Sequence, residues 1–506
     1  MLMRPHQKSL LLFSFFLSAI LFPTSPTHWK TSVFKSAQAQ EQAKSGSKKE
    51  IPARRALQKK LRRIYGKSKS QKGTLGIYVK LLDGPVIFAR NSFRRFHPAS
   101  CMKLLTAGAA LRKLTPKFRF KTTLEGTPKD NTLETPLYIR GEGDPSLTHR
   151  DLAEMSRKLS QMGIKEIPKG IVVDDSHFVH RRFPPGFSRP SPKSYIAPTS
   201  AVSLNGNTVT VEINTNNDSG TCNAEVRVTP PSDHLIISST VKCRKGKSWI
   251  RVAANRKGKK LNVIVRGSIQ PDASPITLRR RVLHPSIYAG ETLKRVLENE
   301  GIKVEGKVKR GITPDNIKAL VEHESAPLQE LITHMNRFSD NHYAEQILKA
   351  TGAKTIGHPG STKKGLEVIA RFMERAGVKR NLYKLFNGSG LFANTSITPR
   401  DLVKFLQRVS TLDWLQEKLV ESLALAGRSG TLARRMSSTR ADGRVRAKTG
   451  TLRDVSTLSG YVLDKKDNPV LIFSILHNDI KGGLTPFRSI QDEIVEELTS
   501  YVDEWR

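Results

Sequence analysis

Apolar residues recur along the chain with strand and helix periods, and the first stretch combines both. Residues 74–82 and 86–89 favour two strands joined by an Asp83-Gly84 turn, which is typical of a β-hairpin. A helical pattern rich in alanine and leucine follows from about 100 to 114, and Pro116 ends it. A hairpin followed by a buried helix is therefore expected near the beginning of the fold.

The pattern changes between residues 116 and 315, where short β-like runs alternate with turns. The expected strands are 118–124, 135–140, 170–173, 208–213, 224–228, 235–241, 249–253 and 261–266. A helix at about 287–300 leads out of this region. We expect a β-rich inserted region here, in one or two pieces.

Helical periods return from about residue 320. Helices are expected at 328–350, 365–376, 398–409 and 413–422, and strands at 445–448, 458–462 and 470–476. Thr485-Pro486 opens a last helix with Ile490, Ile494 and Leu498 on one face. Because strands and a helix occur at both ends, we expect one sheet that both chain ends complete.

A secretory signal peptide is expected over residues 1–39. Arg4 and Lys8 precede an apolar run at 10–22, which is short for a membrane-spanning helix but suits a signal peptide. Ala37-Gln38-Ala39 offers a small-x-small cleavage site, and cleavage nearer Ser25 or a retained membrane anchor stay open as alternatives. In each case the bulk of the chain is periplasmic or extracellular.

The formal net charge of +40 favours anionic partners. Residues 40–55 are expected to form a basic linker, after which Leu57, Leu61 and Ile64 recur at the spacing of a short amphipathic helix. Export makes nucleic acid an unsuitable partner, so we expect none. The anionic partners that fit an exported protein are envelope polymers or a membrane surface.

Three cysteines fit an oxidising compartment. Cys222 and Cys243 bracket a segment rich in β-forming residues, so they fit either a disulfide that ties a hairpin or two separate buried thiols. Cys101 is left as a free, small side chain that could bring redox sensitivity close to Ser100.

Ser-x-x-Lys occurs five times, at Ser32, Ser45, Ser239, Ser361 and Ser100. Only at Ser100 does the pattern follow a proline and open an apolar helix, where the spacing puts Ser100 and Lys103 on one face. A serine hydroxyl is a weak nucleophile that needs an adjacent base. Lys103 can act as that base if burial or a second cation makes it neutral.

Two further motifs follow Ser100 in the chain. Ser339-Asp340-Asn341 precedes a helical pattern, and Lys448-Thr449-Gly450-Thr451 follows a strand-like one, where Lys448 offers the second cation. Each motif has a structural alternative, namely a polar helix start for the first and a glycine-containing strand end for the second. The order Ser-x-x-Lys, Ser-x-Asn, Lys-Thr-Gly distinguishes them from chance matches such as Ser203-Leu204-Asn205.

This triplet resembles the penicillin-binding class of serine enzymes. The fuller match is to class C low-molecular-mass penicillin-binding proteins, the D-alanyl-D-alanine carboxypeptidase/endopeptidase family, from about Ala56 to the C-terminus. Beyond the triplet it rests on residues 96–100, 141–147, 174–178, 201–207, 387–391 and 443–452. The resemblance implies an α/β (α+β) penicillin-binding/β-lactamase-like catalytic domain, with a central antiparallel sheet flanked by helices. It assigns residues 56–115 and 316–506 to that domain and 116–315 to β-rich inserted domains.

The expected reaction is acyl transfer on peptidoglycan peptides, with β-lactams as inhibitors. Ser100 attacks after Lys103 removes its proton, Ser339 relays a proton under the influence of Lys448, and Asn341 holds the substrate amide. Substrate contacts are expected at Thr449, Gly450 and Thr451, where Gly450 would let the substrate approach the strand edge. The resemblance also offers Asp174 for an amino-bearing side chain of the peptide, against a turn or cap role. No metal or cofactor is expected.

Two other functions stay open. A β-lactamase shares the triplet but needs a fast deacylating base, for which no Glu-x-x-x-Asn stands between Asn341 and Asn387. A non-catalytic protein that binds anionic envelope polymers would use the charge alone. The sequence leaves open the balance of carboxypeptidase and endopeptidase activity, the oligomeric state and the purpose of the charge.

Overall fold

The computed structural model describes residues 50–68, 71–187, 191–216, 221–258, 260–392 and 394–505. The expected signal peptide at 1–39 lies outside these residues. Within them, no helix is both long and apolar enough to cross a membrane.

A six-stranded antiparallel sheet forms the centre of the domain expected to be catalytic, in the order β18-β19-β20-β21-β1-β2. Its middle is β21, which pairs with β1 from the opposite end of the chain. The sheet is therefore completed by both chain ends, as the sequence predicted. The strands are β1 (Thr74–Leu81), β2 (Val86–Arg90), β18 (Ala424–Leu425), β19 (Val445–Leu452), β20 (Val455–Leu463) and β21 (Pro469–Asn478).

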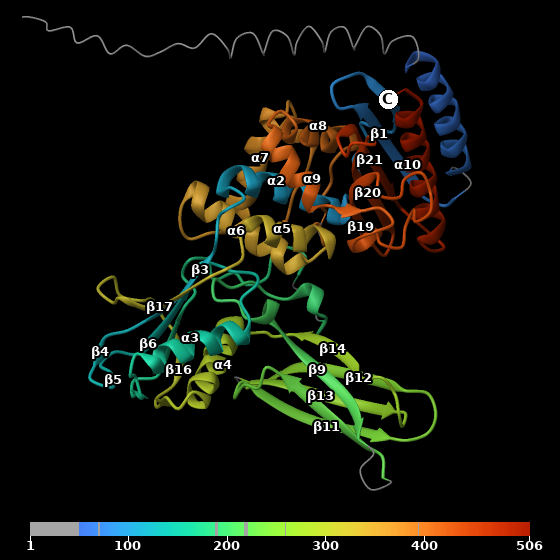
Figure 1. Cartoon of the computed structure of the whole chain (residues 1–506). Coiled ribbons are helices and arrows are strands. Elements are labelled where there is room, and N and C mark those ends of the chain that lie inside the picture. The colour runs from blue at the N-terminus through green and yellow to red at the C-terminus, as the bar shows by residue number, and fades with distance from the viewer. Residues whose placement is uncertain are drawn as a thin grey trace, which may run out of the picture.

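Two helices from opposite chain ends cover one face of this sheet. The helix over residues 50–68 lies beside α10 (Thr485–Trp505), and Figure 1 shows them as the adjacent blue and red helices. Leu57, Leu61 and Ile64 are at most 3% exposed and belong to the same apolar core as α10. The amphipathic helix is thus confirmed, but it already includes residues 50–55, so the linker expected at 40–55 extended too far.

The other face carries a helical layer built around α2 (Met102–Leu114), which is buried at eleven of its thirteen residues. Around it lie α5 (Leu328–Arg337), α6 (Asn341–Ile356), α7 (Thr362–Arg375), α8 (Pro399–Val409) and α9 (Asp413–Ser422). The prediction of a single helix at 328–350 is wrong, because the structure has two helices there, α5 and α6, separated by a short non-helical segment. Ser339 lies in that segment with a φ of 57°, a left-handed conformation that ends a helix.

A second sheet belongs to the inserted region and has the order β16-β8-β6-β3-β17. A small sheet, β15-β7-β5-β4, lies in the same region. Their strands are β3 (Lys121–Glu125), β4 (Pro128–Lys129), β5 (Thr132–Leu133), β6 (Leu137–Gly141), β7 (Glu166–Ile167), β8 (Ile171–Asp174), β15 (Lys303–Val304), β16 (Val308–Arg310) and β17 (Ala319–Glu324). Because β17 pairs with β3, the insertion continues to about residue 324, and the boundary expected at 315 falls too early.

Helices α3 (His149–Gln161) and α4 (Pro285–Asn299) pack together in this region. The sequence predicted α4 at 287–300 but missed α3. The N-terminus of α3 carries a capping box, in which Thr148 and Asp151 satisfy each other's backbone N–H groups. The capping residues Thr148 and Asp151 are a helix signal in the sequence, but the surrounding β-like runs favoured strands in the prediction.

A β-sandwich forms the tip of the insertion. Its two sheets are β10-β9-β14 and β11-β13-β12, and Val211, Val252 and Val265 contribute to the apolar core of the insertion. The strands are β9 (Thr208–Asn216), β10 (Asn223–Thr229), β11 (Leu235–Cys243), β12 (Trp249–Lys257), β13 (Lys260–Ile269) and β14 (Ile276–Arg281). A disulfide joins Cys222 to Cys243. It links the entry of β10 to the end of β11, hence two different sheets rather than the paired strands of a hairpin.

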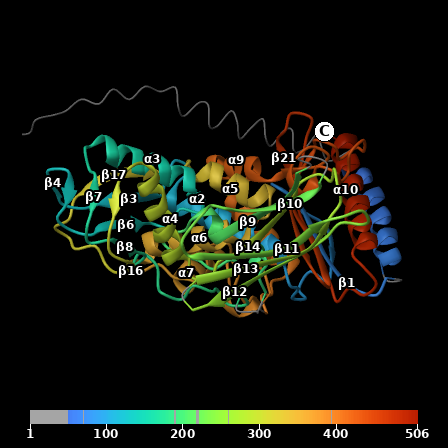
Figure 2. The same cartoon turned by 90° about the horizontal axis from the view of Figure 1, so that it is seen from below.

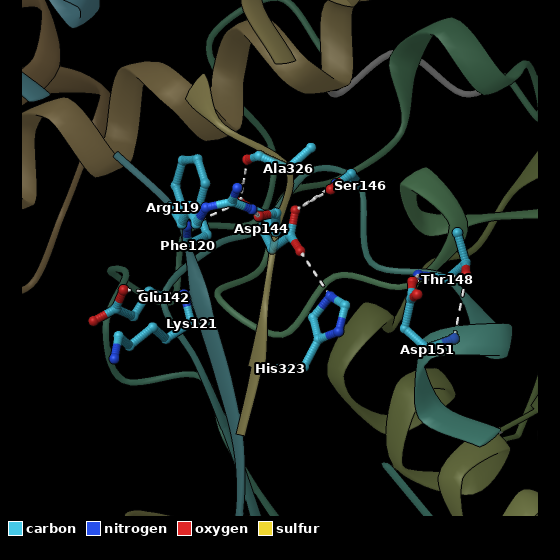
Figure 3. A network of polar contacts seen from close by, with 11 residues as sticks. Arg119, Phe120, Lys121, Glu142, Asp144, Ser146, Thr148, Asp151, His323 and Ala326 are labelled. Atoms are coloured by element: carbon cyan, nitrogen blue, oxygen red, sulfur yellow. Dashed lines mark hydrogen bonds and ion pairs between the residues drawn. The ribbon is translucent and has the colours of Figure 1, made fainter. Parts of the chain in front are cut away.

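The two chain crossings between the catalytic domain and the insertion lie side by side (Figure 3). Arg119 donates to the Ser325 carbonyl oxygen at 2.6 Å, and the Phe120 N–H donates to Ser325 Oγ at 2.9 Å. Asp144, 1% exposed, accepts from Ser146 and lies 3.8 Å from His323 Nε2. Burial raises the pKa of the Asp144 carboxyl. This network holds the insertion at a defined place beside the helical layer.

Replacing Cys222 and Cys243 together by serine tests the sheet-to-sheet link. Opening a loop of this length costs about 3 kcal/mol of unfolding free energy, so the variant should unfold at lower temperature or denaturant concentration. Differential scanning calorimetry with and without reductant measures this. Reductant should lower the stability of the wild type and leave the variant unchanged. Equal stability of both proteins under oxidising conditions would contradict a structural role for the link.

Candidate active site

Ser100 lies in the short 3-10 helix η1 (Ala99–Cys101) that leads into α2. Ala99 has a φ of 45°, and the segment is held by close backbone packing. A Cβ on Gly390 would lie 1.9 Å from the Ala99 carbonyl oxygen, so only glycine fits there. Thr457 Oγ1 donates to the Pro98 carbonyl oxygen at 2.8 Å. The hydroxyl of Ser100 is therefore presented from a rigid turn.

Lys103 is fully buried three residues after Ser100. Its Nζ lies 2.9 Å from Ser100 Oγ, 2.7 Å from Asn341 Oδ1 and 3.0 Å from the Ser389 carbonyl oxygen. A neutral amine has two N–H donors and one lone pair. Asn341 and Ser389 take the two donors as pure acceptors, which leaves the lone pair for the proton of Ser100.

The surroundings of Lys103 favour this neutral form. Burial lowers the pKa of Lys103 well below its ordinary value, and the positive charge of Lys448 lowers it further. Burial also lowers the pKa of Lys448, to about 8. The structure thus gathers two buried lysines, and the pKa of each is lowered, which favours loss of a proton from Lys103.

Ser339 and Lys448 form the second half of the cluster. Lys448 Nζ, on β19, donates to Ser339 Oγ at 2.9 Å and to the Thr449 carbonyl oxygen at 2.8 Å. The helix break at Ser339 points its hydroxyl to β19, while Asp340 caps α6 by accepting from the Tyr343 N–H. The three motifs that the sequence predicted as a group therefore meet in one place.

Asn341 connects this cluster to the inserted region. Its Oδ1 accepts from Lys103, and its Nδ2 donates at 3.0 Å to the carbonyl oxygen of Tyr195. Tyr195 belongs to η2 (Ser194–Ile196), and its side chain is 44% exposed. The sequence analysis missed this residue, because nothing in the local pattern links positions that lie so far apart in the chain.

Glu345 is a second residue that the motifs did not identify. It is fully buried one helical turn after Asn341, and its carboxylate accepts from the backbone N–H groups of Gly388 and Ser389, at 3.1 and 2.8 Å. It thereby holds the loop whose Ser389 carbonyl accepts from Lys103. Burial raises the pKa of Glu345. The i, i+4 relation to Asn341 was the signal that could have found it.

Thr449 and Thr451 lie where β19 has a free edge. Strand β18 pairs only with Arg446 and Ala447, so from Thr449 onward this edge has no neighbouring strand in the described part of the chain. Thr449 donates to Thr431 Oγ1 at 2.7 Å, and Arg488 of α10 donates to Thr451 Oγ1 at 3.4 Å. An extended peptide with a terminal carboxylate fits such an edge.

Gly450 has a different structural requirement from the one expected. A Cβ at this position would lie 2.1 Å from Thr457 Oγ1 and 2.9 Å from Ala99 Cβ. The glycine therefore lets β19 pack against the turn that bears Ser100. A side chain at position 450 is thus excluded by packing inside the protein, and not by the approach of a substrate.

Asp174 is not brought into the cluster. It ends β8 in the inserted sheet, is 1% exposed, and accepts from the N–H groups of Thr313 and Ser176 at 2.8 and 3.0 Å. Its carboxylate is thus occupied by backbone groups of its own domain. This is the cap role that the sequence analysis weighed against a substrate contact.

Cys101 lies behind Ser100 and is fully buried. Its thiol donates to the Lys448 carbonyl oxygen at 3.2 Å, and burial raises its pKa. A buried thiol with a raised pKa reacts slowly with oxidants. The expected redox sensitivity near Ser100 is therefore not supported.

A known peptidase family matches most of the chain. Residues 57–501 match the D-Ala-D-Ala carboxypeptidase 3 (S13) family. The chain belongs to this family. The S13 chain is 31% identical over 449 residues to the D-alanyl-D-alanine carboxypeptidase of Actinomadura sp. (strain R39), covering 84% of this chain and 81% of that relative. It is 26% identical over 423 residues to D-alanyl-D-alanine carboxypeptidase DacB of Haemophilus influenzae, covering 80% and 86%.

The fold of this S13 protein is also found in a solved structure. Penicillin binding protein 4 (dacB) from Haemophilus influenzae superposes with a TM-score of 0.75 at 23% identity, covering 86% of this chain and 99% of that one. The predicted family, the penicillin-binding fold and the serine peptidase class are therefore confirmed. In the described residues, no group of three or more His, Cys, Asp and Glu side chains is placed to hold a metal ion.

Glu345→Gln tests whether the buried carboxylate positions the loop of Ser389. An amide NH₂ in place of one oxygen leaves a buried backbone N–H unpaired at a cost of about 1–3 kcal/mol, which corresponds to roughly 10- to 100-fold slower acylation. The acylation rate by a fluorescent penicillin measures this. Glu330→Gln, exposed on α5, is the matched control and should keep the wild-type rate. An unchanged rate in Glu345→Gln would remove the positioning role.

Proposed function

We propose that this protein is an exported serine peptidase that cleaves the D-Ala-D-Ala bond of peptidoglycan stem peptides through an acyl-enzyme on Ser100. The single observation that carries the assignment is the environment of Lys103. Its two donors are taken by Asn341 and Ser389, and its lone pair faces Ser100 Oγ at 2.9 Å. This is the arrangement that a general base for a serine nucleophile requires.

Acylation follows from the contacts. Ser100 Oγ forms a bond to the carbonyl carbon between two terminal D-alanines, and Lys103 takes the hydroxyl proton. The backbone N–H groups of Ser100 and Thr451 stabilise the oxyanion. The C–N bond then breaks, and the proton passes through Ser339 to the leaving amine. The charge of Lys448, 2.9 Å from Ser339 Oγ, favours this transfer.

The remaining residues hold the substrate and complete the turnover. Thr449 and Thr451 bind the terminal carboxylate along the free edge of β19, close to Arg488. Asn341 holds the amide of the peptide while it orients Lys103. Water then adds to the ester, Lys103 accepts its proton, and the peptide leaves with a new carboxylate while Ser100 regains its hydroxyl.

The same chemistry extends to peptide cross-links, which gives an endopeptidase activity beside the carboxypeptidase activity. β-Lactams fit as inhibitors, since they acylate the same serine, and the Haemophilus influenzae relative has been solved with a bound β-lactam. Action on peptidoglycan places the protein in the cell envelope, in the periplasm or outside the cell. Its charge suits anionic partners there.

A β-lactamase is the weaker assignment. Fast hydrolysis of a penicilloyl ester needs a carboxylate that activates water. The buried carboxylate of Glu345 accepts from two backbone N–H groups and is thereby occupied. Slow deacylation, hence stable penicillin labelling, is the behaviour that these contacts favour.

Ser100→Ala tests the nucleophile. It removes the only atom to which the acyl group would bond, so fluorescent penicillin labelling and D-alanine release from a soluble pentapeptide should both be lost. Ser361→Ala is the matched control, because Ser361 also lies in a Ser-x-x-Lys pattern but caps α7 by accepting from the Lys364 N–H at 3.1 Å. It should keep full labelling. Labelling of Ser100→Ala would overturn the assignment, and rapid loss of label from the wild type would favour a β-lactamase.

The pH dependence tests the two lysines. Acylation needs neutral Lys103 and charged Lys448, so its rate should rise with pH through the lowered pKa of Lys103 and fall near pH 8, where Lys448 loses its proton. Lys448→Ala removes a like charge, so the pKa of Lys103 should rise. The acid limb should then move to higher pH, the alkaline limb should disappear, and the neutral rate should fall about a hundredfold.

The measurement is the acylation rate by fluorescent penicillin across pH. Lys465→Ala, at an exposed turn between β20 and β21, is the control and should keep the wild-type profile. An acid limb that stays in place in Lys448→Ala would show that Lys448 does not set the protonation of Lys103.

A further inference from the structure

The β-sandwich contains a segment in which positive charge is uncompensated. Residues 234–271 hold ten Lys and Arg residues and no Asp or Glu. The ten are Lys242, Arg244, Lys245, Lys247, Arg251, Arg256, Lys257, Lys259, Lys260 and Arg266. This segment forms the sheet β11-β13-β12 and its turns. This sheet therefore carries about a quarter of the formal net charge of +40.

Strand alternation places part of this charge on the outer face of the sheet. Val252 and Val265 are paired and point into the apolar core. Their neighbours Arg251 and Arg266 are also paired, so they point outward side by side, and both are exposed. Like charges directly opposite each other destabilise a sheet. Neither arginine forms an ion pair with an acid among the residues that the structure describes.

An exposed aromatic ring lies next to the two arginines. Trp249 is 52% exposed and points outward, one outward position along β12 from Arg251. Ser268 of β13 lies between Trp249 and Lys242 of β11. The turn that carries Arg244, Lys245 and Lys247 continues the charge at this end of the sheet. We call this set of residues, from Lys242 through the turn to Trp249, with Arg251 and Arg266, the basic face.

The dimensions of the basic face suit a linear partner. Strands of this length span about 30 Å, and the paired residues Lys257 and Lys260 add charge at outward positions at the opposite end of the sheet. Ser238, Thr240 and Asn255 are polar and exposed at outward positions between the two ends, whereas Ile236, Ala253 and Ile264 lie at outward positions and are half-buried. The exposed side chains on this face are therefore cationic or polar, apart from the ring of Trp249.

The basic face is separate from the active site. The other sheet of the sandwich faces the catalytic side, since Arg281 of β14 donates its N–H to the Pro192 carbonyl oxygen beside η2. Figure 1 shows β14 at the near side and β11 at the far side of the sandwich relative to the catalytic domain. In Figure 2, which looks at the molecule from below, β11, β13 and β12 run across this side. A polymer on the basic face would therefore not cover Ser100.

We propose that the basic face binds the peptidoglycan polymer itself, at a second site distinct from the cluster around Ser100. Carboxylates of the stem peptides pair with Arg251, Arg266 and Lys242, and a sugar ring of the glycan stacks on Trp249. The proposal rests on the proposed function, which makes peptidoglycan the substrate. Its effect is to hold the enzyme on an insoluble network and so raise the local concentration of peptides at the active site.

The experiment compares binding and hydrolysis for the full chain. Arg251→Glu/Arg266→Glu and Trp249→Ala should bind insoluble peptidoglycan, stripped of attached anionic polymers, about tenfold more weakly than the wild type at low salt. Raised salt should weaken the binding of the wild type. D-alanine release from a soluble pentapeptide should stay at the wild-type rate in both variants, while release from intact peptidoglycan should fall in proportion to binding.

Two further variants keep the result interpretable. Arg251→Glu alone puts a carboxylate opposite Arg266, which stabilises the sheet, so a loss of binding there cannot come from unfolding. Lys465→Glu/Lys466→Glu makes the same charge change at an exposed turn of the catalytic domain and should bind as the wild type. If the wild type does not hydrolyse the soluble pentapeptide, that result counts against the proposed function and not against the basic face.

Three results would overturn the proposal. They are unchanged binding of stripped peptidoglycan in Arg251→Glu/Arg266→Glu, an equal loss in the Lys465/Lys466 control, and binding that depends on attached phosphodiester polymers or anionic lipid vesicles rather than on peptidoglycan. Retained binding in Trp249→Ala, with loss in the arginine variant, would remove the sugar contact and thereby contradict the glycan part of the proposal.

Discussion

The burial of one amine, Lys103, is the constraint on which the rest of this structure depends. A lysine without access to water must lose its proton or find compensating charge, and here the neighbouring cation at Lys448 favours loss of the proton. The hydrogen-bond partners of Lys103 come from three separate elements: η1, α6 and the loop at Ser389. Movement of any one of these elements would leave a buried polar group without a hydrogen-bond partner. The geometry around Lys103 therefore depends on how the helical layer is packed.

The inserted region takes part in this arrangement and is not merely attached. Tyr195 accepts from the amide of Asn341, and Gln346 on the same helix donates to the carbonyl oxygens of Gly143 and Ser200. Helix α6 thus contacts Lys103 through its first turn and the insertion through its second turn. The insertion thereby contacts the cluster around Lys103, although Ser100, Lys103, Ser339 and Lys448 all lie outside it.

The sequence was sufficient to predict which short motifs come together in the fold. Ser100, Lys103, Ser339 and Lys448 could be named because their order and local context are linear features. Tyr195 and Glu345 could not, since their roles arise from contacts with segments far away in the chain. The break between α5 and α6 was missed because apolar residues recur at helical spacing on both sides of Ser339, although Asp340 offered a local helix cap. The sequence left open whether Cys222 and Cys243 form a disulfide. That the disulfide joins two different sheets could be seen only from the strand order in the structure.

The pairing of β1 with β21 has a consequence for how the protein reaches its active form. Thr74 is aligned with Asn478, so the central sheet closes only when the last strand of the chain arrives. Pairings of such long sequence separation form slowly. Until then β1 and β2, together with the apolar sides of α2, have no sheet to pack on, whereas the insertion is continuous in the chain and its two crossings are adjacent. During synthesis, the insertion would therefore gain its structure first, and the contacts around Ser100 would be completed last.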